Sequence, residues 1–318
     1  MTFLSRITLC VLTPIGVTAR RSINHDFKSF STKKKINKHD WNLTLYQFQN
    51  CPFCCKLRTY LDYNKLNYNV VEVNSITRKQ LKVFGTRKVP LLLCNKEKDD
   101  SENKMILRDS SVIISVLESY LKNENTNLNQ LNNNYKEVTN KVNGKDVKEF
   151  TNRYNLFNSN DEVLDNEEMT SQRRWRDWAD NKLVHVISPN IYKTPKESLE
   201  AFRYFSKCGD WDTKFSSFEK NSMIYLGSMI MYVIGKRLSK KHNLKQDVSE
   251  SLDDCIVEFT NELDKLNSKF IGGSKANLAD LSIYGILSSM EGCKSFKTMM
   301  ERNGRMQKWY TDIKSSIY

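Results

Sequence analysis

The chain of 318 residues lacks the features that mark several large classes of protein. Its eight cysteines are scattered and form no dense, regular framework, which excludes a small disulfide scaffold and indicates reduced thiols in a cytosol-like compartment. After the first C-x-x-C no second one and no paired histidine motif follows, so we expect no metal site. None of the common nucleic-acid-binding motifs is present. The net charge of +13 is therefore expected to favour a membrane surface, with no nucleic acid as partner.

The first 40 residues differ from the rest of the chain. Ile7 to Ala19 is an uncharged, largely apolar run of thirteen residues between arginines, whereas a membrane span needs roughly 20. A secretory signal, a mitochondrial transit peptide and a membrane anchor each fit part of the pattern. The scattered cysteines weigh against secretion. We treat residues 1–40 as a targeting or membrane-anchor segment with a basic linker, whose Lys33-Lys34-Lys35 could contact anionic lipid.

The most informative stretch is Cys51-Pro-Phe-Cys54, which directly follows the strand-like run Leu43 to Phe48. Thioredoxin-like proteins place a reactive thiol in this way, with a strand, a turn and a C-x-x-C that opens a helix. At the start of a helix the unpaired N–H groups and the helix dipole favour negative charge, so a thiolate at Cys51 would be stabilised. Pro52 suits the first helical position because its missing N–H would have no partner there. Since the thiolate is the nucleophile, Cys51 is the predicted reactive residue.

Strand and helix patterns alternate from Leu43 to Leu121. The order of βαβαββα is that of a thioredoxin-like domain, which we assign to residues 41–122. Charged residues 95–103 are expected to form a hairpin loop. The predicted strands are 43–48, 68–73, 89–94 and 104–107, and the predicted helices are 51–64, 77–84 and 109–121.

Two further positions in this domain carry functional expectations. Val89-Pro90 opens the third strand, where a tolerated proline is a bend, an edge or a cis bond, and the topology favours cis. Asp109-Ser110 opens the last helix. A plain N-cap explains this pair, and the free N–H groups with a serine hydroxyl can also hold a carboxylate. Both roles can be filled at once.

The rest of the chain divides into a connector and a helical domain. Residues 123–170 are asparagine-rich at first and are interpreted as a connector with a short helical piece around Val147 to Tyr154. From residue 171 to 318 only helical patterns appear, which predicts an all-α domain. Its histidines, His185 and His242, are expected to be structural. Residues expected to pack in its core are Trp175, Trp178, Met223, Met229 and Met231.

A thioredoxin-like domain followed by an all-helical domain resembles the architecture of glutathione transferases. From about residue 43 almost to the end, the chain further resembles the membrane-associated prostaglandin E synthases of type 2. C-P-F-C is shared with glutaredoxins, whereas strings in the second domain are specific because glutaredoxins lack that domain. The strings that carry the resemblance include Cys51-Pro-Phe-Cys54, Arg87-Lys-Val-Pro90, Asp109-Ser-Ser-Val-Ile-Ile-Ser115, Tyr192-Lys-Thr-Pro195 and Asn277-Leu-Ala-Asp280.

The resemblance implies an isomerase that converts prostaglandin H2, a lipid-derived endoperoxide, into prostaglandin E2 with glutathione as cofactor. It implies that Cys51 is the catalytic thiol and Cys54 its neighbour. Val89 and Pro90 would bind the cysteinyl part of glutathione, and Asp109 and Ser110 its γ-glutamyl end. Bound haem, a homodimer and association with Golgi or mitochondrial membranes are implied as well, with the folded domains in a reducing compartment.

One residue departs from the family pattern. The family has a tyrosine three residues before the first cysteine, and this chain has Phe48 there. The thiolate thereby loses a hydrogen bond that contributes about 0.5–1.5 kcal/mol. Two other functions therefore stay open, since fold alone does not fix function. One is a glutathione-dependent thiol–disulfide oxidoreductase, in which Cys54 resolves a mixed disulfide on Cys51. The other is a non-catalytic protein that binds glutathione and haem.

Overall fold

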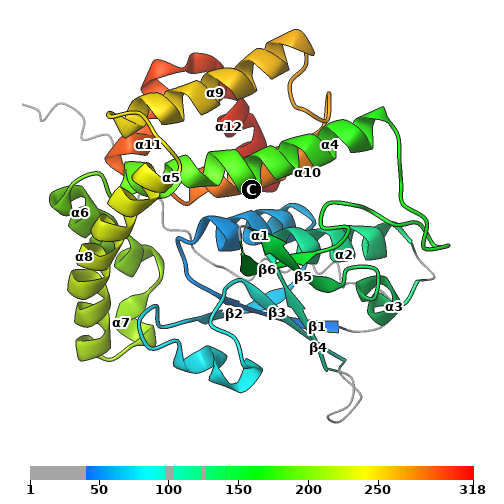
Figure 1. Ribbon diagram of the computed structural model, residues 1–318, viewed down its shortest axis with the longest axis horizontal. Coiled ribbons are helices and arrows are strands. Elements are labelled where there is room, and N and C mark those ends of the chain that lie inside the picture. Colours follow the sequence, from blue (N-terminus) through cyan, green and yellow to red (C-terminus); the bar gives the residue numbers. More distant parts are fainter. Residues whose placement is uncertain (1–40, 97–103, 124–125, 143) are drawn as a thin grey trace, which may run out of the picture.

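The computed structural model describes residues 41–96, 104–123, 126–142 and 144–318. Within these ranges four strands form the main sheet, in the order β2-β1-β3-β4 (Figure 1). β1 pairs with β2 in parallel and with β3 antiparallel, and β3 pairs antiparallel with β4. The strands are β1 (Trp41–Gln47), β2 (Tyr68–Glu72), β3 (Leu91–Lys96) and β4 (Lys104–Arg108).

The helices of this domain are α1 (Pro52–Tyr63), the 3-10 helix η2 (Lys79–Phe84) and α2 (Ser110–Lys122). The predicted order βαβαββα is confirmed, although the helix expected at 77–84 is a 3-10 helix that begins at Lys79. β1 forms because its residues alternate between buried and more exposed positions, as a strand with one face on a core requires. Residues 1–40 and 97–103, which include most of the predicted hairpin loop, lie outside the described residues.

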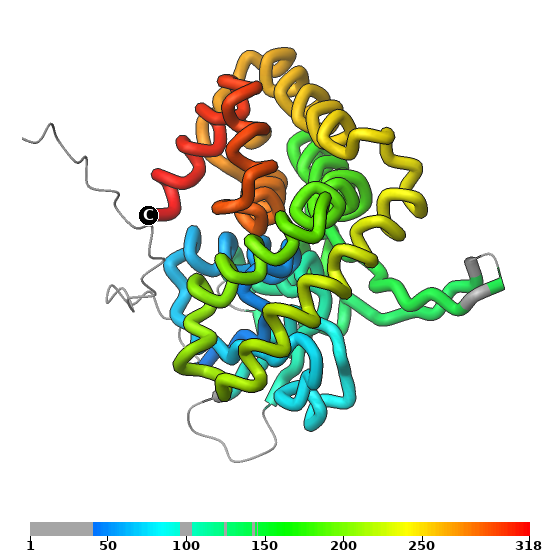
Figure 2. The backbone as a smooth tube through the Cα atoms, turned by 90° about the vertical axis from the view of Figure 1, so that its left-hand side faces the viewer, coloured from blue at the N-terminus to red at the C-terminus, as the bar shows by residue number. Residues whose placement is uncertain are grey.

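The connector contains more regular structure than we expected. It holds α3 (Leu128–Asn132) and a hairpin of β5 (Glu137–Val142) and β6 (Lys145–Phe150). The helical piece predicted around Val147 to Tyr154 is therefore wrong: most of that segment is strand or turn. Figure 2 shows the hairpin projecting away from the body of the molecule.

The second domain is helical, as predicted, with two differences. Its first helix begins at Glu167, within the stretch predicted as connector, and a later helix continues through Pro189 to Ile191. Met229 is exposed rather than packed in the core, whereas Met223 and Trp175 are buried. The elements are α4 (Glu167–Trp178), the π-helix η3 (Ala179–Leu183), α5 (Val184–Ile191), α6 (Pro195–Cys208), α7 (Trp211–Lys214), α8 (Ser217–Lys241), α9 (Val248–Lys265), α10 (Leu278–Ser288), α11 (Lys294–Arg302) and α12 (Gly304–Ile317).

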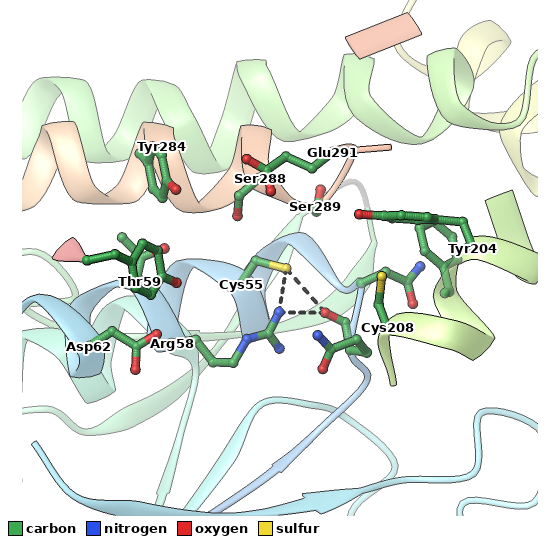
Figure 3. Close-up of a pocket in the computed structure, with 14 residues that line it drawn as sticks. Cys55, Arg58, Thr59, Asp62, Tyr204, Cys208, Tyr284, Ser288, Ser289 and Glu291 are labelled. Carbon is green, nitrogen blue, oxygen red and sulfur yellow. Dashed lines mark hydrogen bonds between the residues drawn. The ribbon is translucent and has the colours of Figure 1, made fainter. Parts of the chain in front are cut away.

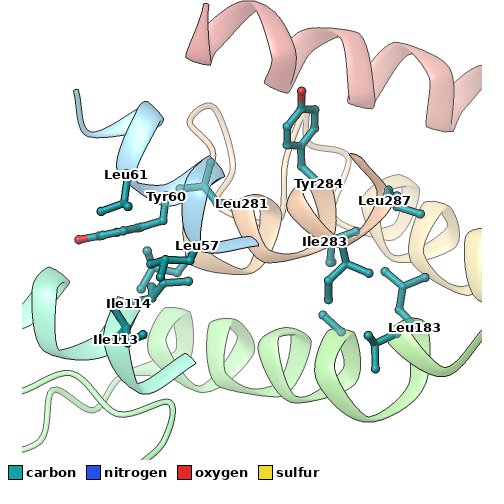
Figure 4. Close-up of a cluster of buried hydrophobic side chains, with 14 of the residues drawn as sticks. Leu57, Tyr60, Leu61, Ile113, Ile114, Leu183, Leu281, Ile283, Tyr284 and Leu287 are labelled. Carbon is teal, nitrogen blue, oxygen red and sulfur yellow. The ribbon is translucent and has the colours of Figure 1, made fainter. Parts of the chain in front are cut away.

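The two domains meet where α1 packs on α10. The side chains of Leu57 and Leu61 on α1 and Leu281 on α10 are buried in one cluster (Figure 4). The helices approach so closely at Gly285 that an added Cβ would lie 2.4 Å from the Cα of Lys56. Lys56 itself points into the junction, where its Nζ lies 2.5 Å from Asp180 Oδ1 of η3. The helix that begins at the predicted reactive thiol is thus fixed by the second domain.

The described residues place limits on membrane and metal sites. No helix among them is both long and apolar enough to cross a membrane. They also contain no group of three or more histidine, cysteine, aspartate or glutamate side chains arranged to hold a metal ion.

Candidate functional site

Cys51 occupies the position that the sequence predicts, immediately before the first turn of α1. It is the N-cap residue, with extended backbone angles (φ −70°, ψ 125°), and Pro52 follows at the first helical position. The Cys51 N–H donates to the Phe48 carbonyl at 3.1 Å, and the Cys51 carbonyl accepts the N–H of Cys55 at 2.9 Å. The Cys51 side chain is half-buried. The local turn therefore holds the sulfur against the helix N-terminus while leaving part of the residue accessible.

The surroundings of Cys51 favour its thiolate. The Cys54 side chain donates a hydrogen bond to the Cys51 sulfur, and this bond lowers the pKa of Cys51 most. The backbone N–H groups of Cys54 and Phe53 and the charge of Arg58 lower it further. Together these effects outweigh burial, and the pKa of Cys51 falls to about 7. Burial, together with this hydrogen bond and the Cys51 charge, raises the pKa of Cys54 well above its ordinary value. One sulfur is thus poised to react, and its neighbour stays protonated as a hydrogen-bond donor.

Arg58 is a part of the site that the sequence analysis missed. Its guanidinium is buried and donates to the side chain of Gln47, to the Gln49 carbonyl at 2.6 Å and to Cys55 Sγ at 3.0 Å. Helical spacing could have indicated this residue, because Arg58 lies seven residues, or about two turns, after Cys51 on the same face. It supplies positive charge beneath the thiols.

Cys55 lines a small cavity between the domains. The cavity has a volume of about 60 Å³. Figure 3 shows Cys55 and Arg58 of α1 facing Ser288 of α10 and Cys208 of α6 across it. Desolvation by burial raises the pKa of Cys55, so its thiol is protonated.

The strand register brings Val89, Pro90 and Asp109 to the same edge of the sheet as the loop before Cys51. Leu91 pairs with Tyr46 on one side and with Arg108 on the other. Pro90 and Asp109, one residue beyond this row, therefore lie beside the end of β1. The Val89–Pro90 peptide bond is cis, as predicted.

The N-terminus of α2 presents a free hydroxyl. Asp109 has φ +66° and caps the helix, since its carboxylate accepts the N–H groups of Ser111 and Val112. It also pairs with Arg153, at 2.9 Å. The neighbouring Ser110 Oγ is buried and has no hydrogen-bond partner among the described residues. Of the predicted pair, Asp109 is thus engaged within the protein and Ser110 has unused hydrogen-bonding capacity for a ligand.

Two aromatic residues flank the loop that carries Cys51. The Phe48 ring lies 5.8 Å from the guanidinium carbon of Arg78. Tyr192, a buried residue at the end of α5, accepts a hydrogen bond from Asn50 Nδ2 at 3.4 Å. The second domain therefore reaches the residue next to Cys51, a contact that sequence patterns do not reveal.

A thioredoxin-type sheet with a C-x-x-C at the start of α1, followed by a helical domain, defines a glutathione-transferase-like protein. Residues 45–124 match the model of the glutathione S-transferase N-terminal domain. Among solved structures, the chain is similar to a glutathione S-transferase III in apo form, with a TM-score of 0.48 and 13% identity over 86% of this chain and 91% of that one.

More similar proteins place the chain within this class. It is 40% identical to prostaglandin E synthase 2 of Danio rerio over an alignment of 304 residues. The alignment covers 94% of this chain and 77% of the relative. It is 39% identical to prostaglandin E synthase 2 of Mus musculus, over 86% of this chain and 70% of the relative. The chain belongs to the prostaglandin E synthase 2 family of enzymes.

Proposed function

We propose that this protein is a glutathione-binding isomerase that converts prostaglandin H2 into prostaglandin E2. The observation that carries the proposal is the half-buried Cys51 sulfur at the start of α1, whose pKa is lowered to about 7. A thiolate is available there at neutral pH without any added base. The names of the two relatives supply the product, a prostaglandin E, and the resemblance to their family implies prostaglandin H2 as the substrate.

The reaction needs no net oxidant or reductant. A thiolate, from Cys51 or from bound glutathione, attacks the endoperoxide oxygen on C9, so that an S–O bond forms and the O–O bond breaks. The C11 oxygen leaves with the electron pair and takes a proton to become a hydroxyl. Loss of the C9 hydrogen as a proton then forms the ketone, and the S–O electron pair returns to sulfur. One proton is gained and one is lost, and the thiolate is regenerated.

Glutathione fits the residues at the sheet edge. Ser110 Oγ lacks a partner among the described residues and lies at the N-terminus of α2, where the helix dipole favours an anion such as the γ-glutamyl carboxylate. Val89 lies ahead of the start of β3 and takes no part in the pairing of β3 with β1 or β4, so its backbone is available to the cysteinyl part of the tripeptide. Asp109 would act through its cap on α2 rather than as a free acceptor, since Arg153 already neutralises it.

Haem is the other group that the resemblance implies. The accessible sulfur of the site, Cys51, is the reacting group of the proposal, and one sulfur cannot serve as iron ligand and nucleophile in the same turnover. The two histidines of the helical domain, His185 and His242, are stacked on each other with ring centroids 3.7 Å apart. We assign no residue to haem and derive no step through it.

A thiol–disulfide oxidoreductase is the second candidate, and the hydrogen bond between Cys54 and Cys51 favours it. Because the Cys51 and Cys54 sulfurs are hydrogen-bonded to each other, they are near enough to form a disulfide by exchange. The variant Cys54→Ser separates the two functions. If the protein is an isomerase, this variant should keep most of its activity on prostaglandin H2, while reduction of a disulfide substrate by the Cys51–Cys54 pair should fail.

The glutathione site is tested by calorimetric titration of the wild type and of Ser110→Ala. The hydrogen bond lost to a carboxylate contributes about 1.5–3 kcal/mol, so Kd should rise at least tenfold. Unchanged affinity in Ser110→Ala would contradict this site. A rate on prostaglandin H2 that is the same for wild type and Cys51→Ser would instead indicate a non-catalytic binding protein.

We further propose that residues 1–40 direct the protein to a Golgi or mitochondrial membrane, with the folded domains in a reducing compartment, and that the protein is a homodimer. The basic, apolar composition of this segment and the net charge of +13 support the first part. Fractionation of cells that express the chain with and without residues 1–40 tests it, and sedimentation of the purified protein tests the second.

A further inference from the structure

The outer face of α8 exposes large apolar side chains. From Asn221 to Gly235 the helix has no charged residue, and its inner side is buried at Met223, Ile224 and Gly227. We call the exposed set the apolar stripe. It consists of Phe218 (82% exposed), Tyr225 (55%), Leu226 (49%), Met229 (69%), Ile230 (44%) and Val233 (46%). Contiguous apolar surface of this kind on a soluble domain marks an interaction site.

The apolar stripe is continuous along the helix. Spacings of three, four, seven and eight residues place its members on one face. From Phe218 to Val233 it extends about 23 Å, at 1.5 Å per residue. In Figure 2, α8 crosses the side of the molecule that faces the viewer, and no other element of the described residues covers this face.

Exposed basic residues lie at both ends of the apolar stripe, and at the N-terminal end Glu219 and Asp212 pair with Lys79 and Lys220. At the N-terminal end, η2 lies beside α8 because Lys79 Nζ contacts Glu219 Oε1 at 2.8 Å. η2 adds the exposed Lys82 and an apolar residue, Val83, which is 84% exposed. At the C-terminal end, exposed basic residues follow the stripe on α8: Lys236, Arg237, Lys240 and Lys241.

We propose that the apolar stripe docks on an anionic lipid surface. An interfacial helix binds by burying an apolar face at the boundary of headgroups and acyl chains, and flanking lysines and arginines add attraction to anionic lipids. A second copy of the chain fits this face less well. Two copies paired in parallel along the stripe would bring their basic C-terminal ends together, and like charges across an interface oppose association.

This contact goes beyond the proposed function because it involves neither the thiol chemistry nor residues 1–40. It does place the lipid surface near the site. On the inner side of α8, Gly235 packs against Tyr192, since a Cβ added to Gly235 would lie 3.5 Å from the Tyr192 Cβ. The Tyr192 hydroxyl in turn accepts from Asn50, the residue before Cys51. α8 would thus lie between the lipid and the loop that carries the thiol.

Fluorescence quenching by brominated lipid tests the proposal in the full chain. The probe is a vesicle of phosphatidylcholine and phosphatidylserine with brominated acyl chains. Tyr225→Trp should gain a fluorescence component that these vesicles quench. The control Val257→Trp, at a position 49% exposed on α9, should be quenched no more than the wild type. Absence of extra quenching for Tyr225→Trp overturns the proposal.

Vesicle partitioning provides a second readout. Met229→Glu and Ile230→Glu each replace a membrane-facing apolar side chain by a charge and should reduce partitioning about tenfold. Val257→Glu should match the wild type, and residues 1–40 are present in every variant and cancel in the comparison. If the stripe variants instead change the sedimenting size and leave partitioning unchanged, a second copy covers the stripe and the proposal fails.

Discussion

Replacing Gly285 by alanine probes the contact that positions the reactive thiol. Gly285 lies on α10 where it crosses α1, and an added Cβ would be 2.4 Å from the Cα of Lys56 and 2.8 Å from its backbone nitrogen. Real Cβ atoms do not approach backbone atoms so closely, and neither atom belongs to a flexible side chain. Either α1 or α10 must therefore move.

The magnitude follows from two opposing effects. Overpacking a well-packed contact typically costs about 1–3 kcal/mol. Alanine in place of glycine inside a helix returns up to about 1 kcal/mol through propensity. Because the clash is with backbone, we expect the cost to prevail and the free energy of unfolding to fall by about 1–2 kcal/mol. A displaced α1 should also slow alkylation of Cys51, which lies at its N-terminus.

Urea unfolding of Gly285→Ala measures the effect, with Gly304→Ala as matched control. Gly304 begins α12, has no heavy atom within 4 Å of an added Cβ and should lose no stability. Equal unfolding midpoints for the two variants would refute the close-packing argument. A stabilised Gly285→Ala protein would show that the helices separate at no cost.

Two other variants test the charges and hydrogen bonds of the site. Cys54→Ala removes the donor to the Cys51 sulfur, so the pKa of Cys51 should rise above about 7 toward 9.0, and Cys54→Ser, which keeps a donor, should shift it less. Alkylation rates against pH report both values, and identical profiles would contradict the assigned hydrogen bond. Asp180→Ala leaves the buried Lys56 ammonium without its carboxylate and should cost about 3–5 kcal/mol in urea unfolding. A loss below about 1 kcal/mol, as for a surface pair, would show that water reaches Lys56.

Local patterns predicted the thioredoxin-like domain well. β1 and α1 follow from short-range signals, namely alternation and a C-x-x-C with proline at the helix start. The cis bond at Pro90 follows from the place of this proline in the predicted order βαβαββα. All three depend on the order of residues along the chain, which is the information that a single sequence contains.

The hairpin of β5 and β6 shows where interpretation of the same local signals failed. Val147 to Phe150, most of β6, belongs to the predicted helical piece, although Asn143-Gly144 precedes β6 and is a strong signal for a hairpin turn. The charged residues on both faces of β6 hide the period of a strand, because most of the hairpin projects from the body and only Phe150, at the end of β6, packs against the core.

Contacts between distant segments could not be predicted from one sequence. Arg58 is buried among Gln47, Gln49 and Cys55, and its pairing depends on how β1 and α1 pack. The exposure of Met229 likewise depends on which side of α8 meets the body, since both sides of this helix are apolar.

The central claim is that Cys51 is a thiolate at neutral pH. The most direct measurement is the rate of alkylation of Cys51 by iodoacetamide from pH 5 to pH 10, with the modified residue identified by mass spectrometry. Because the folded protein lowers the pKa, the rate should rise with a midpoint at about pH 7. A midpoint near 9, the value of an ordinary cysteine, or no reaction at Cys51 in the folded protein, would contradict the account.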